Sequence, residues 1–240
     1  MNDTGGVVLS VRAEARQLVA PDYAELDGLI EHTASSTAQA VQSVSASLDG
    51  LTADLGARGG VPFDQDAARS PLTWSAHAVT TREDRYHDKT TGELKRPGTV
   101  SATVALRITI RDLGTLGDLS GLLAAHPSLN LHTVTWHVDW DNPTWPRVRA
   151  AAVTAAISKA GDYAAALGAT VRHIEHVADT GLLGGDSSPY RAVRTGSNPA
   201  RAVGAGLEHP GGLTLNPVPQ ELIATIEARF RTTDVTLSGG

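Results

Sequence analysis

The fold of this chain is set by its opening stretch, VVLSVRAEA at residues 7–15, followed by APD at residues 20–22 and YAELDGLIEHT at residues 23–33. Apolar and polar residues alternate through the first of these segments, which is the period-two pattern of a half-buried strand. In the third segment Ala24, Leu26 and Ile30 share one face. Pro21 and Asp22 supply a turn between the two segments. The beginning of the chain therefore predicts two successive strands.

A capped helix follows the two strands. Ser36, with Gln39 three residues later, fits a capping box that opens a helix. An apolar stripe then recurs at helical spacing: Val41, Val44, Leu48, Leu51 and Leu55. Gly56 comes directly after the stripe and is expected to end the helix.

Hydrophobic patterning predicts the remaining elements of the chain. Strands are expected at residues 74–85, 99–111, 129–140, 170–178 and 221–231, and helices at residues 112–123 and 143–167. The resulting order is ββα-ββ-αβ-αβ-β. Between the last two strands, residues 179–219 contain 8 Gly and 5 Pro without a hydrophobic period, which predicts an irregular insertion.

Composition excludes several classes of function. The chain has 240 residues, a formal charge of −6 and no run of basic residues, which disfavours nonspecific binding to nucleic acid or an anionic membrane. The absence of Cys excludes disulfides, thiolate metal sites and a Cys nucleophile. No apolar window is long enough for a membrane-spanning helix. Residues 1–6 lack the features of a signal peptide, so a cytoplasmic location is expected.

Four groups of residues, in this order and spacing, carry a resemblance to a known family. They are Ala20-Pro21-Asp22 before the second strand and first helix, Arg111-Asp112-Leu113 with Leu116-Gly117, Ala160 and Ala164 with Leu167-Gly168, and Pro219-Gln220-Glu221-Leu222-Ile223. Over residues 7–232 the chain resembles the SIMPL-domain family, also called the periplasmic or outer-membrane immunogenic protein family.

The resemblance implies an α+β fold in which helices pack on a mostly antiparallel sheet, as one domain over residues 7–232. It also implies a tendency to form ring-like or larger homo-oligomers. The family has no agreed enzymatic activity and no agreed catalytic residues. Bacterial members have been linked to envelope and oxidative-stress phenotypes, and many are exported, whereas this chain shows no signal peptide.

Aromatic and cationic side chains form the candidate interaction surface. Trp136, Trp140 and Trp145 fall within ten residues and are either core residues or anchors for a partner, since aromatic anchors dominate binding energy. In the irregular insertion, Tyr190 with Arg191 and Arg194 either binds an acidic partner or keeps the segment soluble.

A second hypothesis concerns chemistry at His137 and Asp139. They lie two residues apart on a predicted strand and so share a face, which suits a ligand pair or an acid/base pair. They would act with the 179–219 loop in a small-molecule or metal-binding protein or a hydrolase. Two ligands without a third are more often solvated polar residues, and the chain has no G-x-S-x-G motif.

The sequence therefore favours a non-enzymatic protein without cofactor or metal that acts through homo-oligomerisation and protein binding. The binding protein or hydrolase that uses His137 and Asp139 is the alternative.

Overall fold

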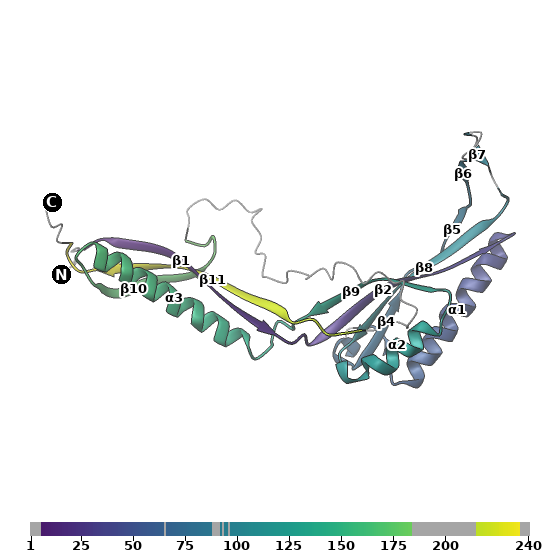
Figure 1. The fold of residues 1–240 in the computed structure, drawn as a ribbon, viewed down its shortest axis with the longest axis horizontal. Coiled ribbons are helices and arrows are strands. Elements are labelled where there is room, and N and C mark those ends of the chain that lie inside the picture. Colours follow the sequence, from purple (N-terminus) through teal and green to yellow (C-terminus); the bar gives the residue numbers. More distant parts are fainter. Residues whose placement is uncertain are drawn as a thin grey trace. The chain divides into compact units, whose positions relative to one another are not determined.

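A computed structural model shows that the chain has the predicted α+β fold, with strands that pair mainly antiparallel (Figure 1). The structure describes residues 6–64, 66–87, 92, 94–95, 97–183 and 215–235. The described residues divide into two compact units. Unit 1 comprises residues 6–19, 138–183 and 219–235, and unit 2 comprises the described residues of 20–137 and 215–218.

Unit 1 is a three-stranded antiparallel sheet covered on one face by a helix (Figure 1). Its elements are β1 (Val8–Val19), α3 (Trp145–Ala166), β10 (Val171–Asp179) and β11 (Gln220–Thr232). The strand order is β1-β11-β10, so the last strand of the chain lies between the first and the tenth. Helix α3 packs on β1 and β11 and has few contacts with β10.

The close packing of α3 on this sheet depends on alanine. Its buried positions recur at every fourth residue and place one side of the helix against the sheet: Val148, Ala152, Ala156, Ala160 and Ala164. Large side chains opposite them, including Phe230, Ile226 and Leu222, fill the core. The helix ends at the predicted place, where Gly168 takes a left-handed conformation with φ of 67°.

Unit 2 is built on a larger sheet with the strand order β3-β4-β8-β2-β9, and β5 also pairs with β8. Its principal elements are β2 (Tyr23–Ala34), α1 (Thr37–Ala57), β4 (Leu72–Ala76), β5 (Thr80–Glu83), β8 (Val100–Ile110), α2 (Leu116–Ala124) and β9 (Leu129–His137). Shorter ones are β3 (Val61–Pro62), β6 (Tyr86–His87) and β7 (Leu94–Lys95), with 3-10 turns at Asp66–Arg69 and Leu113–Thr115. Leucine and isoleucine side chains of the sheet and of both helices fill its core.

The predicted start of α1 is confirmed, and its predicted end is wrong. The side chain of Ser36 accepts a hydrogen bond from the backbone N–H of Gln39 at 3.3 Å, as in a helix cap. The helix continues through Gly56 to Ala57, and the glycine in the left-handed conformation is Gly59, with φ of 80°. The cap therefore falls where the backbone turns rather than at the first available glycine.

Other predicted boundaries also shift. The predicted strand at 74–85 is two strands, β4 and β5, and both pair with β8. The predicted strand at 129–140 ends at His137. The expected short helix near residue 112 is confirmed, since the Asp112 side chain accepts from Gly114 N at 3.0 Å before α2 begins. Most of the predicted insertion at 179–219 lies outside the described residues. Among those described, no helix is long and apolar enough to cross a membrane.

Candidate interaction surface

The long strand β1 has an open edge. It pairs with β11 over twelve residues, from Val8 opposite Arg231 to Val19 opposite Gln220, without a register shift. On its other side no strand pairs with it among the described residues. Such an edge presents unpaired backbone N–H and C=O groups, which can bind another strand.

The register shows which residues of β1 face the open edge. The backbone N–H of Thr232 donates to the carbonyl of Val7 at 3.1 Å, so this pair is hydrogen-bonded. Hydrogen-bonded and non-hydrogen-bonded pairs alternate along an antiparallel ladder. The odd-numbered residues of β1 therefore bond to β11, and the even-numbered residues direct their backbone groups outwards. The ammonium of Lys159 supports this assignment, because it donates to the carbonyl of Arg12 at 3.1 Å.

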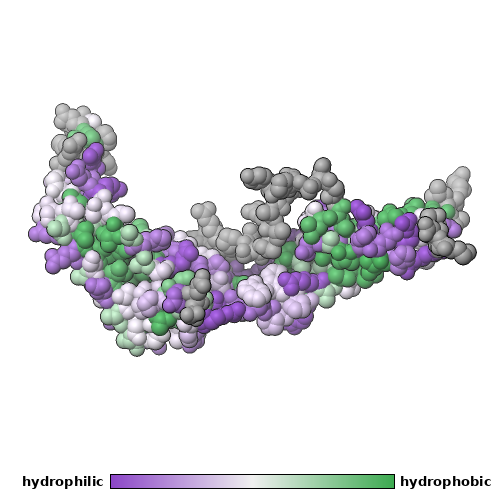
Figure 2. All heavy atoms as spheres, turned by 180° about the vertical axis from the view of Figure 1, so that it is seen from behind, coloured by the Kyte–Doolittle hydropathy of each residue, from purple (hydrophilic) through white to green (hydrophobic). Residues whose placement is uncertain are grey.

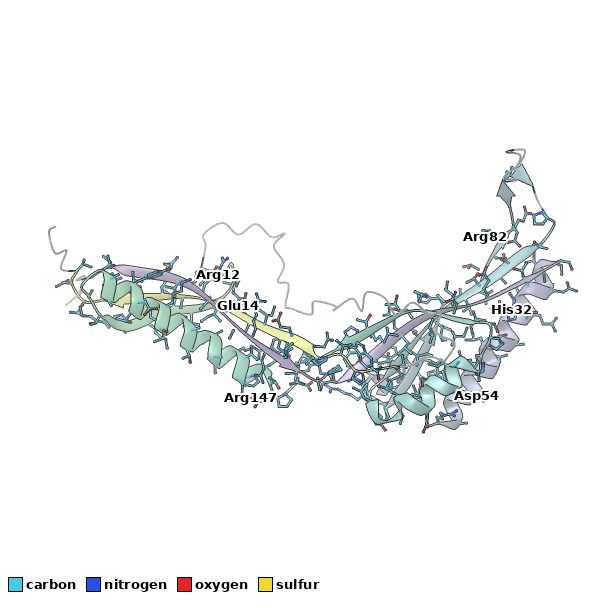
Figure 3. All side chains as sticks on the ribbon, viewed as in Figure 1. Arg12, Glu14, His32, Asp54, Arg82 and Arg147 are labelled. Carbon is cyan, nitrogen blue, oxygen red and sulfur yellow. The ribbon has the colours of Figure 1, made fainter. Side chains whose placement is uncertain are left out.

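Side chains of the even-numbered residues lie on the sheet face that α3 does not cover. Arg12 and Glu14 project from β1 in this way (Figure 3). Glu14 forms an ion pair with Arg16, which also lies 3.4 Å from Glu221 of β11. Val8 and Leu18 stand at the two ends of this row and are 43% and 69% exposed. The face is thus charged in its middle and apolar at its ends.

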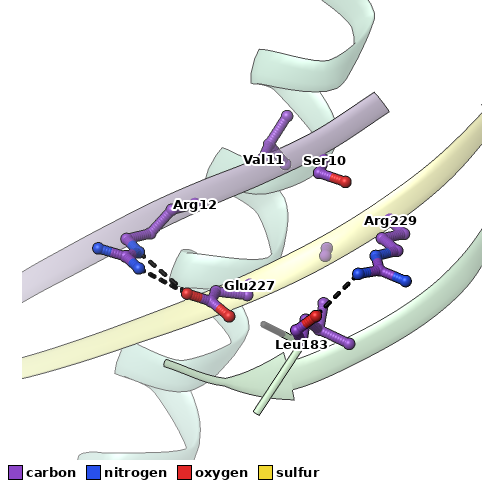
Figure 4. A pocket seen from close by; sticks show the side chains of 7 residues that line it. Ser10, Val11, Arg12, Leu183, Glu227 and Arg229 are labelled. Atoms are coloured by element: carbon purple, nitrogen blue, oxygen red, sulfur yellow. Dashed lines mark hydrogen bonds and ion pairs between the residues drawn. The ribbon is translucent and has the colours of Figure 1, made fainter. Parts of the chain in front are cut away.

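Glu227 of β11 interacts with both β1 and the segment after β10. Nη2 of Arg12 lies 2.6 Å from Oε1 of Glu227, whose side chain is 14% exposed (Figure 4). The hydrogen bond from Arg12 lowers the pKa of Glu227 below its ordinary value, burial opposes this, and the backbone N–H groups of Gly181 and Leu183 lower it further. Arg229 in turn donates to the carbonyl of Leu183 at 2.7 Å. A shallow hollow of about 330 Å³ lies among these residues.

Further apolar side chains of unit 1 are exposed on and beside α3. They are Ile157 and Tyr163 of α3, and Ile174 and Val177 of β10. In the space-filling view, hydrophobic side chains reach the surface among hydrophilic ones (Figure 2). Strand β10 is a less regular edge than β1, because its pairing with β11 shifts register twice.

The three predicted tryptophans occupy different environments. Trp136 is 3% exposed and lies in the core of unit 2, opposite Ala24, so its indole is not part of a surface. Trp140 is 78% exposed in the turn after β9. Trp145 packs against the core of unit 1, and its Nε1 donates to the carbonyl of Asp139 at 3.0 Å. Of these three tryptophans, only Trp140 exposes most of its ring to a partner.

The predicted cationic group cannot be placed, because Tyr190, Arg191 and Arg194 lie outside the described residues. The predicted pair of His137 and Asp139 spans the boundary between the two units, since unit 2 ends its long segment at His137 and unit 1 resumes at residue 138.

His137 belongs to a polar group on the face of the unit 2 sheet opposite the core that α1 and α2 help to form. Its ring stacks on Tyr23 with centroids 4.7 Å apart, and Arg111 lies over the Tyr23 ring at 4.4 Å. Nε2 of His137 lies 3.3 Å from Oε2 of Glu25 and has no well-aligned hydrogen bond among the described residues. Interaction with His137 is the main cause that lowers the pKa of Glu25, and Arg107 adds to it.

Arg107 is the cation at the centre of this polar group. Arg107 binds Asp27 through two hydrogen bonds of 2.7 and 3.3 Å and lies 3.8 Å from Glu25. Within the part of the chain that the structure describes, no three His, Asp or Glu side chains come together as a metal site would require. The cationic and anionic groups here bind one another.

Sequence reasoning missed the residues that form the open edge. Arg12 and Glu14 were visible as the polar face of the first predicted strand, but nothing in the local pattern shows that this strand is an edge. That property depends on β11, more than 200 residues later, taking only one side of β1.

Comparison with known proteins concerns nearly the whole chain. A family model named SIMPL, described as a protein of unknown function (DUF541), matches residues 9–230 and so extends over both units. No curated protein matches the chain significantly.

Proposed function

The chain belongs to the SIMPL family of proteins of unknown function, and we propose that it is a non-enzymatic protein that acts through self-association and protein binding. The observation that carries the proposal is the open twelve-residue edge of β1, with its regular register and exposed apolar ends. Along this edge about six residues each expose a backbone N–H and C=O group. Natural proteins usually cover or interrupt such an edge.

Self-association is the most economical way to cover such an edge. Strand addition satisfies the backbone groups by main-chain hydrogen bonds, and alternate side chains supply specificity. Lys159 covers one carbonyl, that of Arg12, and a single flexible ammonium does not replace a strand.

Binding of other proteins is assigned to Trp140. Its indole is 78% exposed, and large exposed aromatic rings are common anchors at interfaces. The Trp140→Ser variant should lose capture of a partner from lysate while retaining its own oligomeric state. The matched control is Tyr163→Ser, which removes an aromatic ring of α3 that is 48% exposed.

Light scattering coupled to size-exclusion chromatography tests self-association of the full chain over a hundredfold range of concentration. The proposal expects an oligomer whose mass falls towards that of one chain, 25.0 kDa, on dilution, or an oligomer that persists at every concentration. A monomer at all concentrations would contradict the proposal.

The envelope or stress role that the family resemblance implies forms part of the proposal. Deletion of the gene in the source organism should lower survival in peroxide or detergent. Unchanged survival in both would remove this part of the proposal and leave self-association to be judged by light scattering.

A further inference from the structure

We propose that two copies of this chain pair through β1 about a twofold axis at Ala13, so that their unit 1 sheets form one continuous six-stranded sheet. This inference rests on the proposed self-association and names the surface that carries it. The strand order would be β10-β11-β1 in one copy, continued by β1-β11-β10 in its partner.

Backbone geometry restricts the register of such a pair. A twofold axis perpendicular to the sheet makes the two β1 strands antiparallel and keeps the α3-covered faces on the same side. Only even-numbered residues direct N–H and C=O groups to the open edge, as the bond from Thr232 to Val7 and the bond from Lys159 to Arg12 both indicate. Even-numbered residues must therefore face even-numbered residues, so the axis passes through a residue rather than between two.

Side-chain chemistry selects Ala13 among the possible axes. With the axis there, Arg12 of each copy faces Glu14 of the other, which places opposite charges in a directly paired position twice. Val8, 43% exposed, faces Leu18, 69% exposed, at both ends. The third pair of even-numbered residues, Ser10 opposite Arg16, brings no like charges together.

Other axes give poorer pairings. An axis at Glu14 would place Glu14 opposite its own copy and Arg12 opposite Arg16, so that like charges meet. An axis at Arg12 would place Arg12 opposite its own copy. An axis at Ala15 pairs Glu14 with Arg16 but leaves the first residues of β1, including Val8, unpaired.

The helices also fit this arrangement. Because α3 packs on β1 and β11, its axis lies about 5 Å from the twofold axis, given a strand spacing of about 4.8 Å. The two copies of α3 would then lie about 10 Å apart, at the upper end of the spacing of packed helices. Ala151 and Ala155 lie eight and four residues before Lys159, on the side of α3 that reaches the edge, and are small. Lys159 itself lies beside Arg12, next to the axis, and must release the Arg12 carbonyl before the two strands pair.

A single engineered cysteine tests the register directly, because the chain has none of its own. Ala13 faces its own copy in a non-hydrogen-bonded pair, where Cα atoms lie about 4.5 Å apart, a separation that a disulfide can bridge. The Ala13→Cys variant should therefore form a disulfide-linked dimer under mild oxidation. The matched control is Ala15→Cys, a half-buried alanine on the same strand face, whose copies would lie about 14 Å apart along the strand.

The outcome separates this inference from the proposed function. Rapid, near-complete crosslinking of Ala13→Cys with at least tenfold slower crosslinking of Ala15→Cys is expected. Faster crosslinking of Ala15→Cys would move the axis and overturn the proposed register. If neither variant crosslinks although light scattering shows an oligomer, the axes at Ala13 and Ala15 are both excluded, so the proposed register is wrong and self-association stands. If the unmodified chain is a monomer, both proposals are wrong. Circular dichroism of the two reduced variants checks that each is folded.

Discussion

Strands β1 and β10 are the two edges of one sheet, and they differ in how they would meet another strand. The pairing of β10 with β11 shifts register twice, and such irregularities interrupt the row of backbone groups that an incoming strand requires. Strand β1 runs for twelve residues in one register, and apart from Lys159 no side chain is seen bonding to its outward carbonyls among the described residues. One edge is thus irregular and the other is suited to pairing.

The local sequences of β1 and β10 do not explain this difference. Both strands carry charged residues of both signs, so composition alone does not distinguish them. The two strands differ in how regularly they pair with β11, the strand between them. Substitutions that remove single backbone N–H groups of β1 test this difference.

The largest expected effect comes from proline substitutions at neighbouring residues of β1, whose N–H groups point to opposite sides of the strand. Ala13→Pro removes an N–H that bonds to β11 opposite Ile226 and should destabilise unit 1 by about 3 kcal/mol. Glu14→Pro removes an outward N–H instead, so the fold should keep its stability to within about 1 kcal/mol while the dimer is lost. Urea unfolding and light scattering measure the two properties. Equal destabilisation by both variants would show that the assignment of odd and even residues is wrong.

A smaller effect is expected from reversing one charge at the open edge. In the proposed pair, Glu14→Lys places Lys opposite Arg12 in both halves of the dimer, which should weaken dimerisation by about 2 kcal/mol, or about thirtyfold. The control Glu221→Lys makes the same charge change on the same face, but on the central strand β11.

The double variant Arg12→Glu with Glu14→Lys restores opposite charges across the twofold axis. Sedimentation equilibrium should show recovery of most of the lost affinity. Because Arg12→Glu also breaks the ion pair with Glu227, urea unfolding checks that the double variant is folded. Failure of the folded double variant to recover, or an equal loss in Glu221→Lys, would place the interface elsewhere.

The sequence predicted the elements of the fold better than their partners. Ser36 and Gln39 located the start of α1 because a helix cap is a local interaction. The pairing of β1 with β11 could not be predicted, because strand partners are chosen by contacts between residues far apart in the chain. The end of α1 at Ala57, with the left-handed turn at Gly59 rather than at Gly56, likewise depends on how the chain turns towards β3.

The candidate site shows the same limit. Trp136 and Trp140 are four residues apart and similar in context, yet one is in a core and the other is exposed. The difference arises because β9 ends at His137, so the alternation that buries Trp136 does not extend to Trp140. Arg12 and Glu14 acquire their importance only when β1 proves to be an edge.

Removing the one side chain that bonds to the open edge should have a modest effect in the opposite direction. Lys159→Met frees the carbonyl of Arg12 for a partner strand, so the dimer should become tighter by about fivefold. Lys159→Arg keeps a donor and serves as the control. Sedimentation equilibrium of both variants makes the comparison, and weaker dimerisation of Lys159→Met would indicate that Lys159 belongs to the interface rather than blocking it.

The smallest expected effect concerns Glu227, which joins the two edges by accepting from Arg12 of β1 and from the backbone after β10. Because its pKa is lowered in the folded protein, its carboxylate stabilises the fold above the ordinary glutamate pKa of about 4.3, and this contribution is lost as the pH falls through the lower folded value. Stability of Glu227→Gln should therefore decline less steeply than that of the unmodified chain below about pH 4.3. Urea unfolding from pH 3 to 7 measures the slope. Glu221→Gln, a more exposed carboxylate on the same strand, is the control. Identical slopes in the unmodified chain and Glu227→Gln would mean that Glu227 does not hold β1 and the segment after β10 together in solution.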